Sequence, residues 1–288
     1  GDAVLATGLL RGLVGKPDLQ AGMVVRDSFA ELLEGHPMLR WLHPFQKTGK
    51  GGFPRVLESI RKVKYDVALI PHRSARSALL AWRAGIPRRI GFRQSALPLL
   101  LTDSVEYQIA EHETDRNAAL LLRAGIFAAA RNPWLHTSPH DFPTMLPYVA
   151  ELADGKPLVL IAPGSVWPTK RWTPQGYVSV VRQLAERGAA VVLVGSPGER
   201  ELCQRIASDG GLPAAHNLAG TLSLGQLAFL ISRAAHVVAN DSAPVSAGSA
   251  SPTVLACRRC THRLVPHLRL GFLRPSSGRW RSDHDHPC

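Results

Sequence analysis

The chain has 288 residues, of which 45% are hydrophobic and 19% charged, a balance typical of a globular protein rather than a disordered one. Its 34 lysines and arginines outnumber 22 acidic residues and give a formal net charge of +12. This excess predicts an anionic partner such as a nucleotide, a nucleic acid or an acidic membrane surface. No apolar run approaches the roughly 18 residues that a membrane-spanning helix needs.

Strand and helix patterns alternate along the first half of the chain, which predicts an α/β protein with parallel sheets. The predicted strands are 22–26, 38–45, 65–72 and 88–92. The predicted helices are 3–14, 27–35, 53–63, 74–84 and 111–124. Prolines then interrupt the pattern over 131–156, which predicts an interdomain connection with a short helix at 146–153.

The same alternation restarts in the second half. Strands are predicted at 157–162, 189–194 and 236–239, and helices at 173–188, 199–207 and 223–233. Ligands of parallel sheets bind beyond the carboxyl ends of the strands. We therefore predict that loops 163–172, 195–199 and 240–244 converge on a ligand.

Residues 245–288 differ in composition, with seven arginines, four histidines and three cysteines but no lysine. Most of this segment shows neither helical nor strand periodicity, so it is predicted to be an atypical basic tail. A zinc site is one hypothesis for this segment, with the candidate ligands Cys257, Cys260, His284, His286 and Cys288. Their spacing is unusual for a zinc site. The body of the chain has no disulfide framework, which favours a reducing, cytosolic compartment.

The loop at 163–172 has the features of a phosphate site. Gly164 and Ser165 form a tight turn after a strand, and Lys170 and Arg171 precede a helix that Thr173 caps. Helix N-terminal amides and two cations attract phosphate. The loop has neither a GxxxxGK[ST] nor a GxGxxG pattern, and an ordinary loop with surface cations remains the alternative.

Two acidic positions have both a functional and a structural interpretation. In Asn240-Asp241-Ser242, at the end of a strand, the carboxylate could accept hydrogen bonds from a sugar and the hydroxyl could donate to phosphate. Asp2 precedes a helix, where a carboxylate stays ionised and could act as a base. In both places a helix N-cap is the alternative.

Cationic and polar side chains follow or flank two predicted strands of the first half. They are His72, Arg73, Ser74, Arg76, Arg88, Arg89 and Arg93. These clusters are suited to an acidic acceptor, and a solvated face is the alternative.

Several segments together resemble glycosyltransferase family 9, the ADP-heptose:lipopolysaccharide heptosyltransferases, and most closely its heptosyltransferase II branch. The resemblance covers residues 1–244 in order. Its segments are GDAVLATGLLRGL (1–13), YDVALIPHRSARSALL (65–80), AGIPRRIGFRQS (84–95), HETDRNAALL (112–121), IAPGSVWPTKRW (161–172), VVLVGSPGERE (191–201), HNLAGTLSLGQLAFLISRA (216–234) and VVANDSAP (237–244).

The resemblance implies a GT-B fold, in which two Rossmann-like domains face a cleft. The expected boundaries are an acceptor domain at 1–135, a linker at 136–156, a nucleotide-sugar domain at 157–244 and the tail at 245–288. The implied reaction is the inverting, metal-independent transfer of L-glycero-D-manno-heptose from ADP-heptose to the lipopolysaccharide inner core (Kdo/heptose-lipid A), without a cofactor. The implied location is the cytoplasm, peripheral on the anionic inner membrane of a Gram-negative bacterium, with no nucleic-acid partner.

The resemblance also implies roles for residues. Asp2 matches the general base, and Lys170 matches the lysine that contacts the diphosphate. The expected donor-binding residues are Gly164, Ser165, Lys170, Arg171, Glu199, Asn240, Asp241 and Ser242. The expected acceptor-binding residues are His72, Arg73, Ser74, Arg76 and Arg93.

The chain departs from the family at both ends. The family's initial strand, before the glycine-aspartate pair, is missing, and Ser246 stands where the family has histidine. The family pattern is lost in the tail and returns briefly at LGFLRPSS (270–277), which suggests a local change of reading frame. We therefore expect this chain to be poorly active or inactive.

Two other functions are alternatives. One is a GT-B transferase that uses another nucleotide sugar. The other is a non-enzymatic, basic nucleic-acid-binding protein, which the low aromatic content of 6% disfavours because stacking platforms are few.

Overall fold

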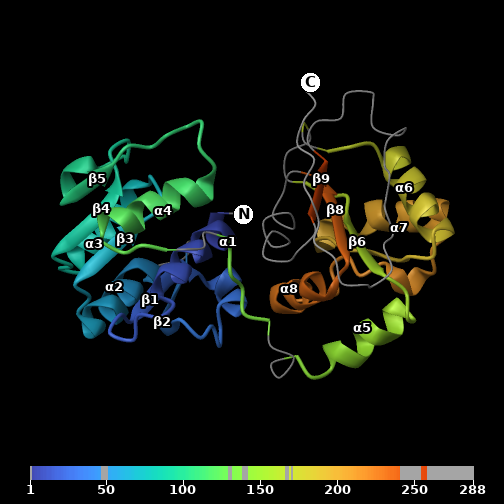
Figure 1. Cartoon of the computed structure of the whole chain (residues 1–288), viewed down its shortest axis with the longest axis horizontal. Helices are drawn as coiled ribbons and strands as arrows, with labels where there is room; N and C mark the ends of the chain where they lie inside the picture. Colours follow the sequence, from blue (N-terminus) through green and yellow to red (C-terminus); the bar gives the residue numbers. More distant parts are fainter. Residues whose placement is uncertain are drawn as a thin grey trace. The chain divides into compact units, whose positions relative to one another are not determined.

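The computed structural model describes residues 2–46, 51–128, 132–137, 142–165, 169, 171–240 and 254–257. Parallel strands alternate with helices in both halves of the chain, as Figure 1 shows. The predicted α/β class is therefore confirmed. Each half is described separately below.

The first half contains two parallel sheets. In one, β1 (Ala21–Arg26) pairs with β2 (Leu39–Phe45). The other has the order β3-β4-β5, formed by Val67–Ile70, Arg88–Phe92 and Asp103–Val105. The α-helices are α1 (Asp2–Ala6), α2 (Gly52–Val63), α3 (Ala75–Arg83) and α4 (Glu113–Arg123), and the 3-10 helices are η1 (Thr7–Leu13), η2 (Asp27–Leu32) and η3 (Pro98–Leu100).

The second half contains one parallel sheet with the order β7-β6-β8-β9. These strands are β6 (Leu158–Ala162), β7 (Ala190–Leu193), β8 (His236–Asn240) and β9 (Val254–Cys257). The helices are α5 (Met145–Ala153), α6 (Pro174–Glu186), α7 (Arg200–Gly210) and α8 (Leu224–Arg233), with the short 3-10 helices η5 (Pro197–Glu199) and η6 (Ala214–His216).

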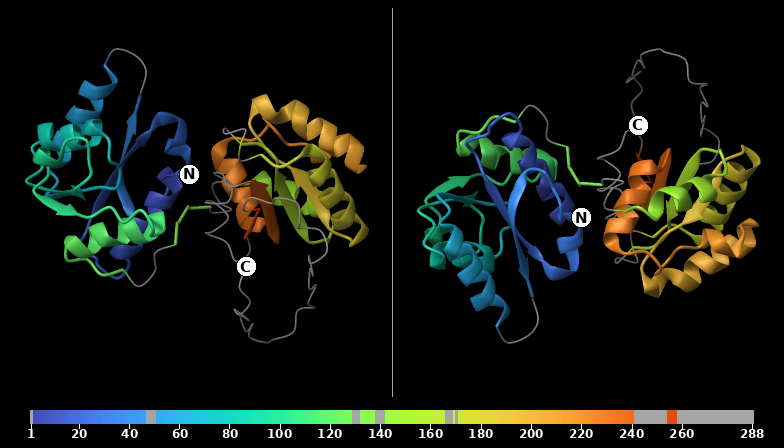
Figure 2. Two further views of the ribbon diagram at one scale, coloured as in Figure 1. Left: turned by 90° about the horizontal axis from the view of Figure 1, so that it is seen from above. Right: turned by 90° about the horizontal axis from the view of Figure 1, so that it is seen from below.

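Every residue of β6 is buried, because helices cover both faces of this sheet. Leu160 packs on one face with Phe229 of α8 and Val149 of α5. Alternate strand residues point to opposite faces, so Ile161 points to the face opposite to that of Leu160. Helices α6 and α7 cover that other side of the sheet (Figures 1 and 2). The sheet is thus a rigid support for the loops at its carboxyl edge.

The structure differs from the predicted elements in several places. The sequence did not predict β5, whose three residues are too few to show a strand pattern, and it did not predict β9 in the basic tail. The predicted helix at 3–14 is a short α1 followed by η1, in which Gly8 and Gly12 weaken helix formation. The predicted helix at 27–35 is the 3-10 helix η2.

Within the described residues, β1 pairs only with β2, and β3 pairs only with β4. Both strands are more exposed than β6: Val24 in β1 is 41% exposed and Val67 in β3 is 39% exposed. Two short sheets therefore stand where a Rossmann-like half usually has one continuous sheet.

His36 connects the segment 132–137 to the first half. Its side chain is 2% exposed, and its Nδ1 accepts a hydrogen bond from the Met38 backbone N–H at 3.2 Å. Nε2 therefore carries the proton and donates to the carbonyl oxygen of Trp134 at 3.1 Å. Burial lowers the pKa of His36 from 6.5 to about 4.

The lowered pKa of His36 predicts that the free energy of unfolding falls in mild acid. Between pH 6.5 and pH 4 the unfolded chain binds a proton at His36 that the folded chain does not. Stability therefore decreases as pH falls, by about 2 kcal/mol between pH 7 and pH 5. His36→Gln keeps one donor and one acceptor but does not titrate, so denaturant unfolding of this variant should show a smaller loss. His112→Asn, at an exposed helix cap, is the control. An equal loss in His36→Gln and the parent would contradict the prediction.

Candidate active site

The carboxyl ends of β6, β7 and β8 meet at one edge of the second sheet, because these strands are parallel. The described residues from the expected donor site at or beyond this edge are Gly164, Ser165, Arg171, Glu199 and Asn240. Lys170, Asp241 and Ser242 lie outside the described residues. Loops far apart in the sequence therefore come together as predicted, and contact with a donor stays a prediction.

Asn240, the last residue of β8, holds the edge together. Its side chain is 1% exposed, and Nδ2 donates to the carbonyl oxygens of Pro163 at 2.7 Å and Gly164 at 3.1 Å. Its Oδ1 accepts hydrogen bonds from the Trp172 backbone N–H at 3.0 Å and the Tyr177 hydroxyl at 2.9 Å. One buried amide thus connects β8 to the start and end of loop 163–172 and to α6.

Glu199 lies beside Gly164 at the same edge. Its Oε2 accepts hydrogen bonds from the Ser196 backbone N–H at 2.7 Å and from the Ser196 hydroxyl at 2.9 Å. Its carboxylate also occupies the space that a Cβ at position 164 would need. Glycine at 164 is therefore required for this close approach, which brings the loops after β6 and β7 into contact.

The loop before α6 closes on itself. Arg171 Nε donates to the carbonyl oxygen of Ser165 at 2.8 Å, and Thr173 Oγ1 accepts from the Gly176 backbone N–H at 3.2 Å. Pro174 occupies the first turn of α6, as predicted. The described residues on either side of position 170 thus belong to a loop that leads into a capped helix, an arrangement suited to phosphate.

A second polar edge lies beyond the carboxyl ends of β3 and β4. Arg73 and Arg93 are exposed, and their loops are connected by a hydrogen bond from the Ala96 backbone N–H to the carbonyl oxygen of Arg73 at 3.0 Å. His72 Nδ1 accepts from the backbone N–H of Ser74 at 3.1 Å. The structure therefore brings these expected acceptor residues to one edge.

Arg76 lies on α3, with its guanidinium carbon 5.6 Å from the centre of the Phe45 ring, at the end of β2. Sequence reasoning missed Tyr107, whose ring contacts Arg73. Tyr107 comes just after β5, so recognising that short strand would have placed this aromatic residue at the acceptor edge.

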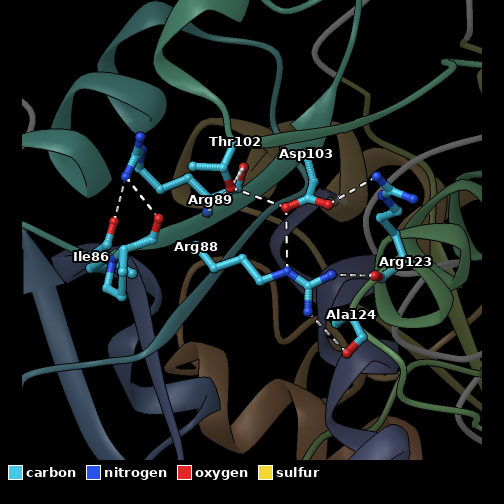
Figure 3. Close-up of polar contacts among 8 residues, drawn as sticks. Ile86, Arg88, Arg89, Thr102, Asp103, Arg123 and Ala124 are labelled. Atoms are coloured by element: carbon cyan, nitrogen blue, oxygen red, sulfur yellow. Dashed lines mark hydrogen bonds and ion pairs between the residues drawn. The ribbon is translucent and has the colours of Figure 1, made fainter.

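Arg88 and Arg89 do not belong to this edge, so that part of the basic-cluster hypothesis was wrong. Arg88 begins β4, where Nε pairs with Asp103 Oδ2 at 3.3 Å and NH2 donates to the carbonyl oxygen of Arg123 at 2.8 Å (Figure 3). Arg89 Nε donates to the carbonyl oxygen of Leu100 at 2.6 Å.

Both arginines therefore stabilise the fold at the amino ends of β4 and β5. The hydrogen bond from Arg88 is the main cause that lowers the pKa of Asp103, and Arg123 also pairs with this carboxylate at 3.0 Å. This cluster connects the end of α4 to the sheet.

α1 begins at Asp2, one residue before the predicted start at position 3, and the side chain of Asp2 is not among those described. The role of Asp2 as a base stays a prediction. The zinc hypothesis also concerns side chains that are not described. In the part of the chain that the structure describes, no group of three or more His, Cys, Asp or Glu side chains could hold a metal ion. No helix in this part is long and apolar enough to cross a membrane.

A parallel α/β sheet with a glycine turn, a carboxylate and loop-closing hydrogen bonds at its carboxyl edge is typical of proteins that bind nucleotides there. Comparison with known sequences identifies the protein family. The chain belongs to glycosyltransferase family 9 (heptosyltransferase), whose sequence model matches residues 54–252.

The relatives agree with this assignment. Lipopolysaccharide heptosyltransferase 2 of Salmonella typhimurium is 31% identical over 201 residues, which cover 65% of this chain and 58% of that protein. The chain thus spans less than two thirds of the length of this curated relative.

Solved structures show the same fold. Escherichia coli ADP-heptose LPS heptosyltransferase II superimposes with a TM-score of 0.70 at 26% identity, covering 89% of this chain and 81% of that one. A glycosyl transferase family 9 structure from Veillonella parvula gives a TM-score of 0.79 at 22% identity, covering 89% of this chain and 76% of that one. The expected GT-B fold is therefore confirmed.

Proposed function

We propose that this protein transfers L-glycero-D-manno-heptose from ADP-heptose to the inner core of lipopolysaccharide. The observation that carries this proposal is the match of residues 54–252, a range that includes both sheet edges described above, to a family described as heptosyltransferase. The names of the relatives from Salmonella and Escherichia coli, both lipopolysaccharide heptosyltransferase 2, further support it.

In the proposed reaction the edge of β6, β7 and β8 binds the donor. Lys170 and the backbone amides at the start of α6 meet the negative charge that builds on ADP as it leaves. Ser165, Glu199, Asp241 and Ser242 are the further donor contacts. Asn240 and Arg171 support these contacts by closing the loop before α6.

The edge of β3 and β4 binds the acceptor in this proposal, with Asp2 as the base. The carboxylate of Asp2 takes the proton of the acceptor hydroxyl while its oxygen forms a bond to the anomeric carbon. The bond from that carbon to ADP breaks, and ADP leaves with the electron pair. Attack from the face opposite to ADP inverts the configuration, and the proposed reaction needs no metal.

We propose the same division along the chain, with 1–135 binding the acceptor, 136–156 as linker, 157–244 binding the donor and 245–288 as an atypical basic tail. The net charge of +12 supports a location at the cytoplasmic face of an anionic inner membrane, because surface cations are each worth about 1 kcal/mol there.

Donor binding tests the proposal without requiring turnover. The melting temperature of the whole chain should rise with ADP-heptose and not with GDP-mannose, UDP-glucose or duplex DNA. Lys170→Ala should remove this rise, whereas Lys156→Ala, at an exposed lysine near Asp154, should keep it. Stabilisation by another nucleotide sugar alone would favour a different GT-B transferase. Tighter, salt-sensitive binding of DNA would favour the nucleic-acid alternative.

A further inference from the structure

Tyr107 contacts the guanidinium of Arg73 at the carboxyl edge of the β3-β4-β5 sheet. The Arg73 guanidinium carbon lies 4.2 Å from the centre of the Tyr107 ring, within the range of a cation–π interaction. Arg73 is exposed, and no carboxylate forms an ion pair with it among the residues that the structure describes. An aromatic face therefore orients this positive charge without neutralising it.

The ring of Tyr107 is itself held in place. Phe92 makes an edge contact with it, at 5.0 Å between ring centres and an interplanar angle of 89°. The backbone N–H of Tyr107 donates to Gln94 Oε1 at 2.8 Å, and its hydroxyl donates to Glu113 Oε2 at 3.4 Å. The carboxyl end of β4 and the start of α4 thus determine how the ring faces Arg73.

A second guanidinium on the same ring serves a different purpose. The Arg116 guanidinium carbon lies 4.4 Å from the ring centre, but Arg116 pairs with Glu113 at 2.5 Å. It also donates to the carbonyl oxygens of Gln108 and Ile109, at 3.1 and 3.4 Å. Because its charge and donors are used within the protein, only Arg73 of this pair keeps them for a ligand.

We propose that Tyr107 is a positioning residue that presents Arg73 to an anionic group of the acceptor, a phosphate or a carboxylate. A guanidinium stacked on a ring keeps its N–H donors free in its own plane, where they match two oxygens of such an anion. Arg76 and Arg93, also exposed, add positive charge at the same edge. This inference rests on the proposed function, because it assigns a role within the acceptor site.

A double-mutant cycle tests the proposal. The whole chain is titrated calorimetrically with a deacylated inner-core oligosaccharide, which is used intact, dephosphorylated or carboxyl-reduced. Arg73→Ala and Tyr107→Leu should each weaken binding of the intact form, the latter by about threefold to thirtyfold. The double variant should bind no more weakly than Arg73→Ala. Tyr107→Phe keeps the ring and should bind within about threefold of the parent.

Arg40→Ala is the matched control, because Arg40 is also exposed and stacks on an aromatic ring, that of Trp41 at 5.3 Å. It should bind like the parent. The modified oligosaccharide that removes the difference between parent and Tyr107→Leu identifies the anion as phosphate or carboxylate.

Additive losses in the double variant, or a Tyr107→Leu variant that binds like the parent, would overturn the proposal. So would a parent chain that does not bind the intact oligosaccharide. The melting-temperature rise with ADP-heptose is measured on the same samples. If that rise persists, the positioning role fails while the donor part of the proposed function stands.

Discussion

Replacing Asp2 with asparagine should lower the rate of heptose transfer, which is already expected to be low in this chain, by about 10²- to 10⁴-fold, the usual contribution of a general base. Asparagine has nearly the same size and is also favoured at the start of a helix, so α1, whose first residue is at this position, should be kept. It cannot take a proton from the acceptor hydroxyl. The variant therefore separates the role of a base from that of a helix cap.

The rate should be measured as ADP released in the presence of acceptor, in the parent and in Asp2→Asn. Binding of ADP-heptose should be unchanged, since Asp2 belongs to the proposed acceptor side. Asp18→Asn, at an exposed carboxylate between η1 and β1, is the matched control and should keep the parent rate. A variant that keeps the parent rate of acceptor-dependent ADP release would contradict the prediction.

Replacing Asn240 with alanine should destabilise the second half by about 3–5 kcal/mol. The change leaves the carbonyl oxygens of Pro163 and Gly164, the backbone N–H of Trp172 and the hydroxyl of Tyr177 without this partner in a buried place. A buried polar group without a partner costs about 1–3 kcal/mol. Denaturant unfolding of the whole chain gives the loss.

Two further variants show that the pattern of hydrogen bonds matters and not only the volume. Asn240→Asp places a second acceptor against two carbonyl oxygens, so it should be at least as destabilising as Asn240→Ala. Tyr177→Phe removes one donor and should cost only about 1 kcal/mol. A small effect of Asn240→Ala on stability would contradict the prediction.

Asn240 also shows how far sequence reasoning extends. Its place at a strand end follows from local pattern, because a short apolar run precedes it. Its partners do not, because they lie 63 to 77 residues away and depend on how loop 163–172 folds back. The contact of Asn240 with a donor stays a prediction, and the structure adds that its amide closes the loop.

The residues of the acceptor edge were likewise predicted only in part from the sequence. His72 and Arg73 were predicted because a clear buried-strand pattern precedes them. Tyr107 was missed because β5 has only three residues and no recognisable period. Arg88 and Arg89 carry the same charge as Arg73, but only tertiary contacts show that carbonyl groups and Asp103 use them.

The separate sheets of the first half affect how the chain behaves in concentrated solution. Within the described residues, each of the outer strands β1, β2, β3 and β5 has one side where its backbone N–H and C=O groups have no neighbouring strand. Such a side is a template for any extended peptide, including the same segment of another molecule. Aggregation during purification is therefore expected to begin at these outer strands, and a short peptide that pairs with them should suppress it.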